Sequence, residues 1–199
     1  MKIGKLAIAF AAALPLAAAA EVESYTIDPY HTVPYFEVDH LGFATMRGRF
    51  DRATGKLSID RAAKTGSLEI AVPTATLSTG DTERGSRPRT RDEHLRTADF
   101  FNVAEFPSMN FKSTKVNFSG ENPTTVEGNL TLLGVTKPLT LVVERWKCGT
   151  DMRTQGKRYQ CGGNASGTFK RSEFGMKYGL PTAVGDDVKL WMSFYGFKD

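Results

Sequence analysis

Residues 34–50 alternate between two kinds of side chain with a period of two. The odd positions include several charged residues, whereas the even positions carry Pro34, Phe36, Val38, His40, Gly42, Ala44, Met46, Gly48 and Phe50. A period of two predicts a β-strand with one buried face, but this run is longer than a typical strand. Because glycine inside a strand marks a bend or bulge, we expect one long strand that bends sharply, as the wall of a closing barrel does.

The same alternation recurs along most of the chain. Turn-forming residues separate the alternating runs, which cover 57–59, 68–72, 109–118, 126–132, 139–143, 165–171 and 188–194. Together with the first run they predict about eight strands, each with one apolar face. Repeated short strands of this kind are typical of an all-β sandwich or barrel.

One segment, RDEHLRTADFF (residues 91–101), breaks the alternation and is the best helix candidate after residue 20. Thr90 or Asp92 can cap its start, and Glu93 places negative charge in its first turn. Leu95 and Ala98 follow helical spacing, and Pro107 prevents continuation. We expect a short helix between two strands that covers an open end of the barrel.

The first twenty residues read as a secretory signal peptide. Lys2 and Lys5 precede an apolar run, and small residues end the segment at Ala20, which is the order of regions in such signals. The run is too short to span a bilayer as a helix. We expect cleavage near Ala20, a soluble domain over residues 21–199 and export to the periplasm.

The charge balance argues against a nucleic-acid partner. The chain has 26 basic and 22 acidic residues, and removal of Lys2 and Lys5 brings it close to neutrality. Nucleic-acid-binding domains usually carry a clear basic excess. We therefore expect no nucleic-acid partner.

Cys148 and Cys161 are the two cysteines. An even number of cysteines in an exported protein indicates a disulfide bond. The polar, glycine-containing residues between them indicate that this bond staples the base of a hairpin. A metal site is the weaker alternative, since two thiolates do not make the usual four-ligand zinc site.

Several motifs in order make the chain resemble the YceI-like family of polyisoprenoid-binding or lipid-binding proteins. The motifs are YTIDPYHTVPYFEVDHLG, MRGRFD, RDEHLRTADFFN, FPSMNFKST, VEGNLTLLGVTKPLTL and RSEFGM, which extend from Tyr25 almost to the end. The resemblance implies an antiparallel, eight-stranded lipocalin-like barrel that holds one long isoprenoid or other amphiphilic lipid chain. It also implies no agreed catalytic residue and, for many members, export.

The sequence contains little that points to catalysis. No nucleophile-elbow, zinc-protease or phosphate-loop motif is present. His31, His40 and His94 are the only histidines, and their wide separation in sequence argues against a metal site. We expect no enzyme activity, no metal and no cofactor; a lipid- or quinone-directed enzyme using His40 or His94 is a less favoured alternative.

The aromatic residues concentrate near the expected barrel wall and its helical cover. Glycines at even positions, namely Gly42, Gly48 and Gly128, together with Gly167, indicate unfilled space unless neighbouring side chains occupy it. The alternative is a barrel filled by its own side chains. We expect the ligand to contact His31, Tyr35, Phe36, Val38, His40, Phe43, Met46, Phe50, Leu95, Phe100, Phe101, Phe106, Phe111, Leu130, Phe169, Arg171, Phe174 and Met176.

Polar residues near the mouth would recognise the head group of the ligand. His31, Arg171 and Asp186 are the candidates, and the alternative for Arg171 is a salt bridge to Glu173 or Asp99. The arginines of the loop before the helix, Arg84, Arg87 and Arg89, either belong to a solvated surface loop or attract an anionic lipid head or membrane surface.

The expected function is therefore that of a periplasmic lipid-binding protein. It would hold a long isoprenoid chain, of the polyprenyl phosphate or quinone type, for carriage or sequestration. A fatty acid or fatty amide in the same pocket is the alternative, and a structural protein with a filled core is another. The sequence decides neither transient contact with a membrane nor formation of a homodimer.

Overall fold

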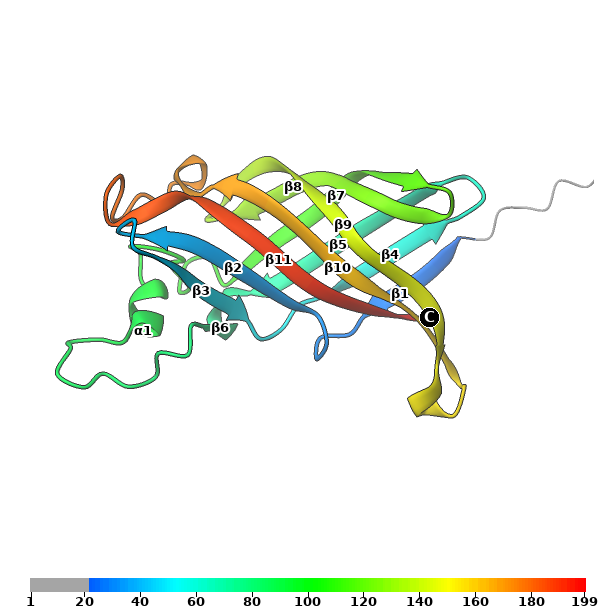
Figure 1. The fold of residues 1–199 in the computed structure, drawn as a ribbon, viewed down its shortest axis with the longest axis horizontal. Helices are drawn as coiled ribbons and strands as arrows, with labels where there is room; N and C mark the ends of the chain where they lie inside the picture. The colour runs from blue at the N-terminus through cyan, green and yellow to red at the C-terminus, as the bar shows by residue number, and fades with distance from the viewer. Residues whose placement is uncertain (1–21) are drawn as a thin grey trace, which may run out of the picture.

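The structure, a computed structural model, describes residues 22–199, in which one antiparallel sheet contains 11 strands. Eight of these strands close into a ring, because β11 pairs with both β10 and β1 (Figure 1). In ring order they are β1 (Glu23–Ile27), β4 (Thr54–Asp60), β5 (Thr65–Pro73), β7 (Ser108–Ser119), β8 (Asn122–Leu132), β9 (Val135–Asp151), β10 (Arg158–Lys170) and β11 (Val184–Lys198). The predicted eight-stranded antiparallel barrel is confirmed, whereas the predicted signal peptide lies outside the described residues.

The three remaining strands extend the wall at one end of the barrel. They are β2 (Val33–His40), β3 (Ala44–Phe50) and β6 (Leu77–Ser78), and β2 pairs with the first part of β11. Three short 3-10 helices complete the elements: η1 (Thr74–Thr76), η2 (Met152–Thr154) and η3 (Arg171–Phe174). Among residues 22–199, we find no helix with the length and apolar character needed to cross a bilayer.

The prediction of one bent strand over residues 34–50 was wrong. Leu41 and Gly42 have φ angles of 58° and 70°, so the chain reverses there and β3 returns beside β2. In this hairpin His40 pairs with Ala44, and even positions lie opposite even positions throughout. The same alternation therefore fits a continuous strand and a hairpin equally well. The short strand β1, which closes the ring, was not predicted.

The helix α1 (Arg91–Leu95) begins where the sequence indicated. The Thr90 hydroxyl accepts a hydrogen bond from the Glu93 N–H at 3.1 Å, and the Glu93 carboxylate accepts one from the Thr90 N–H at 2.8 Å. This reciprocal arrangement is a capping box. The helix is shorter than expected, since it ends at Leu95 and the chain continues in turns to β7.

Turns after α1 bring aromatic side chains onto the barrel interior. Phe101 packs edge-on against Phe50 at a centroid distance of 5.3 Å, and Phe100 is only 7% exposed. Figure 1 shows α1 at the end of the barrel where the β2–β3 turn also lies. We call this the mouth end. The segment covers that end, as the sequence predicted.

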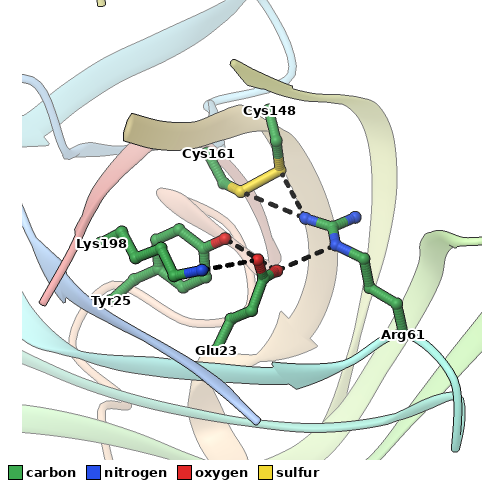
Figure 2. The surroundings of a disulfide bond; sticks show 6 residues. All are labelled: Glu23, Tyr25, Arg61, Cys148, Cys161 and Lys198. Carbon is green, nitrogen blue, oxygen red and sulfur yellow. Dashed lines mark hydrogen bonds and ion pairs between the residues drawn. A yellow bond between two sulfur atoms is a disulfide. The ribbon is translucent and has the colours of Figure 1, made fainter. Parts of the chain in front are cut away.

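The opposite end, which we call the closed end, carries the predicted disulfide. Cys148 and Cys161 are direct partners on β9 and β10, and their sulfurs lie 1.99 Å apart. The disulfide therefore crosses the β9–β10 hairpin as predicted, but near its turn rather than at the base of the paired strands. Arg61 also reaches this bond, because its Nη2 donates to Cys148 Sγ at 3.1 Å (Figure 2).

A charged cluster surrounds the disulfide. The Glu23 carboxylate accepts hydrogen bonds from Arg61 Nε at 2.9 Å, Lys198 Nζ at 3.0 Å and the Tyr25 hydroxyl at 3.0 Å (Figure 2). Burial opposes ionisation of Glu23, but these donors outweigh it and hold the pKa of Glu23 below its usual value. Burial, aided by the bond to Glu23, raises the pKa of Tyr25 to about 12.

Candidate functional site

A cavity of about 320 Å³ occupies the mouth half of the barrel. Strands from all sides contribute to its wall, and α1 and the residues after η3 border its opening. The wall is mainly apolar, and its lining residues are Pro34, Tyr35, Phe36, Val38, His40, Met46, Arg47, Phe50, Ile70, Val72, Thr79, Arg91, His94, Leu95, Phe100, Phe101, Met109, Asn110, Phe111, Leu130, Leu132, Leu139, Leu141, Ala165, Phe169, Arg171, Met176, Tyr178, Ala183, Val184, Val188, Leu190, Trp191 and Met192.

Strand alternation positions the apolar wall. On β11, Val188 and Leu190 face the cavity while Lys189 between them is exposed. Leu190 pairs with Phe36 of β2 across the sheet, so neighbouring strands place large apolar groups at the same height. The resulting hollow suits a long apolar chain, because its burial removes hydrocarbon surface from water without leaving polar groups unpaired.

Most of the predicted ligand contacts lie on the wall of this cavity. Tyr35 belongs to the wall strand, but its ring packs against the exposed Trp191 at 5.4 Å, on the outer side. Contact of Tyr35 with a ligand stays a prediction. The predicted residues that line the cavity are Tyr35, Phe36, Val38, His40, Met46, Phe50, Leu95, Phe100, Phe101, Phe111, Leu130, Phe169, Arg171 and Met176.

Four predicted contact residues are absent from the cavity lining. Phe43 is 91% exposed at the β2–β3 turn, because the chain reverses where a continuous strand was expected. Phe174 is buried against Phe169, Phe106 packs over the Cα of Gly134, and His31 pairs with Asp28. Phe174, Phe106 and His31 are held by their own neighbours and Phe43 faces solvent, so the structure does not place these four on the wall.

The inward glycines do not create the hollow, contrary to the expectation. A Cβ at Gly48 would lie 2.3 Å from the ring of Phe36, and one at Gly128 would lie 2.5 Å from the ring of Phe111. Gly42 lies in a turn. Neighbouring side chains therefore fill the positions that lack a side chain, and the cavity lies elsewhere, between opposite walls of the barrel.

The polar groups of the lining gather near the mouth, and several are basic. Arg91 Nε donates to the Thr79 hydroxyl at 2.9 Å, and Arg91 forms no ion pair within residues 22–199. His40 and His94 also line the opening. No aspartate or glutamate of the described chain belongs to the lining. The mouth thus favours a neutral or acidic group over a cationic one.

Arg171 anchors the loop that borders the mouth. It is 2% exposed, and its guanidinium donates to the carbonyl oxygens of Gly185 at 2.7 Å, Val184 at 2.7 Å and Met176 at 3.0 Å. Burial lowers the pKa of Arg171 from its usual value. The predicted alternative, a salt bridge to Glu173 or Asp99, is not what holds it. Its main contacts are to the backbone, so most of its hydrogen-bonding capacity is used within the protein.

The other two head-group candidates lie off the cavity. His31 Nδ1 lies 2.6 Å from an Asp28 carboxylate oxygen. The Asp186 carboxylate accepts from the N–H of Ser172 at 2.9 Å and from its hydroxyl at 2.8 Å. Both residues therefore satisfy local backbone and side-chain partners. Sequence reasoning missed Arg91, although it lies in the segment singled out as the cover.

His94, at the mouth, contacts one carboxylate and two aromatic rings. His94 Nε2 lies 2.8 Å from Asp99 Oδ2, and the His94 ring contacts Phe100 at 5.0 Å and Tyr178 at 4.9 Å. Residues 22–199 contain no group of three or more histidine, cysteine, aspartate or glutamate side chains placed to hold a metal ion. His94 thus serves as a packed wall residue with an oriented ring.

The arginines of the loop before α1 face carboxylates. Arg84 forms an ion pair with Glu93 at 2.6 Å, and Arg87 forms one with Asp81 at 2.8 Å. Arg89 lies 3.4 Å from Asp99. These pairs favour the interpretation as a solvated loop, since the positive charge is compensated within the segment.

Many wall residues were missed because the selection favoured aromatic and polar positions and included few aliphatic ones. The missed apolar residues occupy alternate positions of the predicted strands. Their position on the inward side of each strand would therefore have identified most of them. Its members are Ile70, Val72, Met109, Leu132, Leu139, Leu141, Ala165, Val188, Leu190 and Met192.

Solved structures resemble this barrel closely enough to show the fold. Burkholderia cenocepacia BcnA superposes with a TM-score of 0.65 at 19% identity, covering 82% of this chain and 95% of that one. A polyisoprenoid binding domain from Saccharophagus degradans, described as implicated in plant cell wall breakdown, gives 0.60 at 15% identity, with 88% and 98% covered.

Sequence comparison identifies the family. A UPF0312 protein of Shewanella denitrificans is 35% identical over 201 residues, covering 100% of both chains. A UPF0312 protein of Pseudomonas aeruginosa is 33% identical over 195 residues, covering 96% of each. The YceI-like domain matches residues 25–195. The chain therefore belongs to the YceI-like family.

Proposed function

We propose that this protein binds the chain of an isoprenoid lipid, of the polyprenyl phosphate or quinone type, inside the barrel, for carriage or sequestration. The observation that carries the proposal is the cavity of about 320 Å³ with its mainly apolar wall. Burying one methylene group gains roughly 0.8 kcal/mol, so a chain of several isoprene units has a large driving force. The polyisoprenoid binding domain among the structural neighbours supports the same ligand class.

The distribution of apolar and polar lining residues supports one orientation of such a ligand. The hydrocarbon chain would lie among the apolar strand residues, and the head group would lie at the mouth near Arg91 and His94. Because no carboxylate of the described chain lines the cavity, an acidic or neutral head would meet no carboxylate of the wall itself. This function needs no catalytic group.

The proposed site of action is the periplasm. The disulfide supports an oxidising compartment, and residues 1–20 have the pattern of an export signal. Detection of the protein in a periplasmic extract, with its N-terminus after residue 20, tests this location. Membrane contact and a homodimer stay predictions.

The test of the function is extraction of the purified protein with organic solvent, followed by mass spectrometry and by titration with added isoprenoid lipid. Leu190→Gln places a polar group on the cavity wall and should weaken binding at least tenfold. Lys189→Gln, on the exposed neighbour, is the matched control and should leave binding unchanged. Absence of copurifying lipid together with no binding of added isoprenoid would overturn the proposal, and displacement by a fatty acid or fatty amide would redirect it to that ligand class.

A further inference from the structure

A second, smaller cavity lies beyond the main one toward the closed end, and its volume is about 30 Å³. Leu141, Ala165 and Met192 line both cavities. The rest of the smaller wall is apolar apart from Ser58 and the buried, unpaired indole N–H of Trp146, and it consists of Leu57, Ser58, Ile59, Leu68, Val116, Pro123, Val126, Val143, Trp146 and Phe194. The two cavities are therefore consecutive spaces within one barrel interior.

The boundary between the cavities is one layer of side chains. On β11, Leu190 lines only the main cavity, Met192 lines both, and Phe194 lines only the smaller cavity. The same order holds on β9, where Leu141 is the shared residue. Alternate residues of a strand face the same side. The successive inward residues of β9 and β11 therefore run along the interior from the mouth end to the closed end.

Met192 is the boundary side chain best suited to move. Methionine is unbranched and has three rotatable bonds, so it adapts to irregular spaces. Its direct partner on β10 is Ala165, a small residue that leaves room beside it. Leu141 is branched and only 6% exposed, and the methyl group of Ala165 has no alternative position.

The smaller cavity is a favourable place for hydrocarbon. Protein interiors are normally close-packed, and atoms that face a void lose dispersion contacts. Apolar voids stay dry and accept apolar guests. The end of a lipid chain would restore the missing contacts there, once the Met192 side chain has moved aside.

We propose that Met192 is a movable floor that sets the length of chain the barrel accepts. Chains that end within the main cavity bind without displacing it, whereas longer chains push it aside and extend into the smaller cavity next to Trp146. This inference rests on the proposed function and deepens it, since it assigns a residue that determines chain-length specificity.

Measuring the affinity for isoprenyl monophosphates of increasing length, from geranyl to octaprenyl, tests directly whether Met192 sets the accepted chain length. Each further buried methylene strengthens binding about fourfold. With the wild-type protein we expect each added isoprene unit to increase the affinity less once the main cavity is full. The ratio of long-chain to short-chain affinity should rise about tenfold in Met192→Ala and fall about tenfold in Ala165→Leu, relative to the wild type.

Met109→Ala is the matched control, because Met109 lines only the main cavity. It should alter affinity for short and long chains by the same factor. Thermal unfolding of each variant shows whether it folds. If Met192→Ala and Ala165→Leu also change short- and long-chain affinity equally, Met192 does not set chain length.

A spectroscopic readout avoids dependence on the boundary variants. The chain contains two tryptophans, so Trp191→Phe leaves Trp146 as the single fluorophore beside the smaller cavity. Long isoprenyl phosphates with a terminal bromine, at saturation, should quench Trp146, and short ones should not. Binding of long chains without quenching overturns this inference alone, whereas no binding at any length overturns the proposed function with it.

Discussion

The two ends of the barrel are held together in different ways. At the closed end a disulfide joins β9 and β10, and a partly buried charged cluster around Glu23 joins β1, Arg61 after β4, and β11. At the mouth end, Arg171 and ion pairs on the α1 segment hold loops over a hollow. The covalent link therefore lies at the end opposite the opening.

The same contrast appears in the interior. Near the mouth, opposite walls leave room for a chain, whereas the interior toward the closed end retains only the smaller cavity. The covalent link and the main cavity thus lie in different halves of the barrel. Substitutions can test whether these halves respond independently.

Removing the guanidinium at the mouth should have the largest effect. Arg171→Leu leaves three backbone carbonyls without their charged donor, and hydrogen bonds to charged groups contribute about 1.5–3 kcal/mol each. We expect a loss of about 3–5 kcal/mol in the free energy of unfolding, measured in urea. Arg89→Leu, which removes a surface group, should cost less than about 1 kcal/mol. A similar small loss for Arg171→Leu would show that the loop does not depend on it.

Removing the disulfide should come next. The double variant Cys148→Ser, Cys161→Ser should lose about 3 kcal/mol, because the unfolded chain regains the freedom of the closed loop. Urea unfolding measures this loss, and ligand affinity should stay within about twofold because the bond lies at the other end. A reducing agent should destabilise the wild type only; an equal effect on the double variant would contradict the assignment to this bond.

A smaller effect is expected from the unpaired cation at the mouth. Arg91→Gln removes a donor that would form a charge-assisted hydrogen bond with an acidic head. It should weaken binding of an isoprenyl phosphate about tenfold, equivalent to about 1.4 kcal/mol, and leave the alcohol of equal chain length unaffected. Arg89→Gln serves as control. Equal weakening of phosphate and alcohol would show that Arg91 contacts the chain or the fold instead.

The smallest effects are expected from pH, with opposite signs at the two ends. Hydrogen bonds from Arg84 and the Thr90 N–H lower the pKa of Glu93 to about 2, and the bond from Arg87 lowers the pKa of Asp81 to about 2. Folded pKa values below the unfolded ones of 4.5 and 3.8 mean that this stabilisation is present above about pH 4 and is lost as pH falls toward 2.

At the closed end the relevant pKa is raised in the folded protein. The pKa of Tyr25 rises from 10.0 to about 12, so its contribution is complete below pH 10 and is lost as pH rises through 12. Hydrogen exchange resolved by residue should show mouth-end opening first in acid and additional closed-end opening in alkali. Tyr25→Phe should remove the alkaline part; an unchanged alkaline profile in that variant would exclude Tyr25 as its origin.

The strands and the α1 segment at the mouth could be predicted from local sequence patterns. Alternation predicted the long runs that became β7 to β11, and Thr90 with Glu93 predicted the start of α1. The hairpin at Leu41 was missed because a turn that keeps parity leaves the pattern unchanged. The short β1 carried too few alternating residues to be recognised, although it closes the ring.

The sequence by itself determined which side chains face inward, because strand parity is a local property of the backbone. It also determined the cysteine pair and the helix cap. Only the tertiary structure decided where space remains: Phe36 and Phe111 fill the positions beside inward glycines, and Met192 divides what is left. The reason is that a hollow depends on how side chains from distant strands meet, and no single strand contains that information.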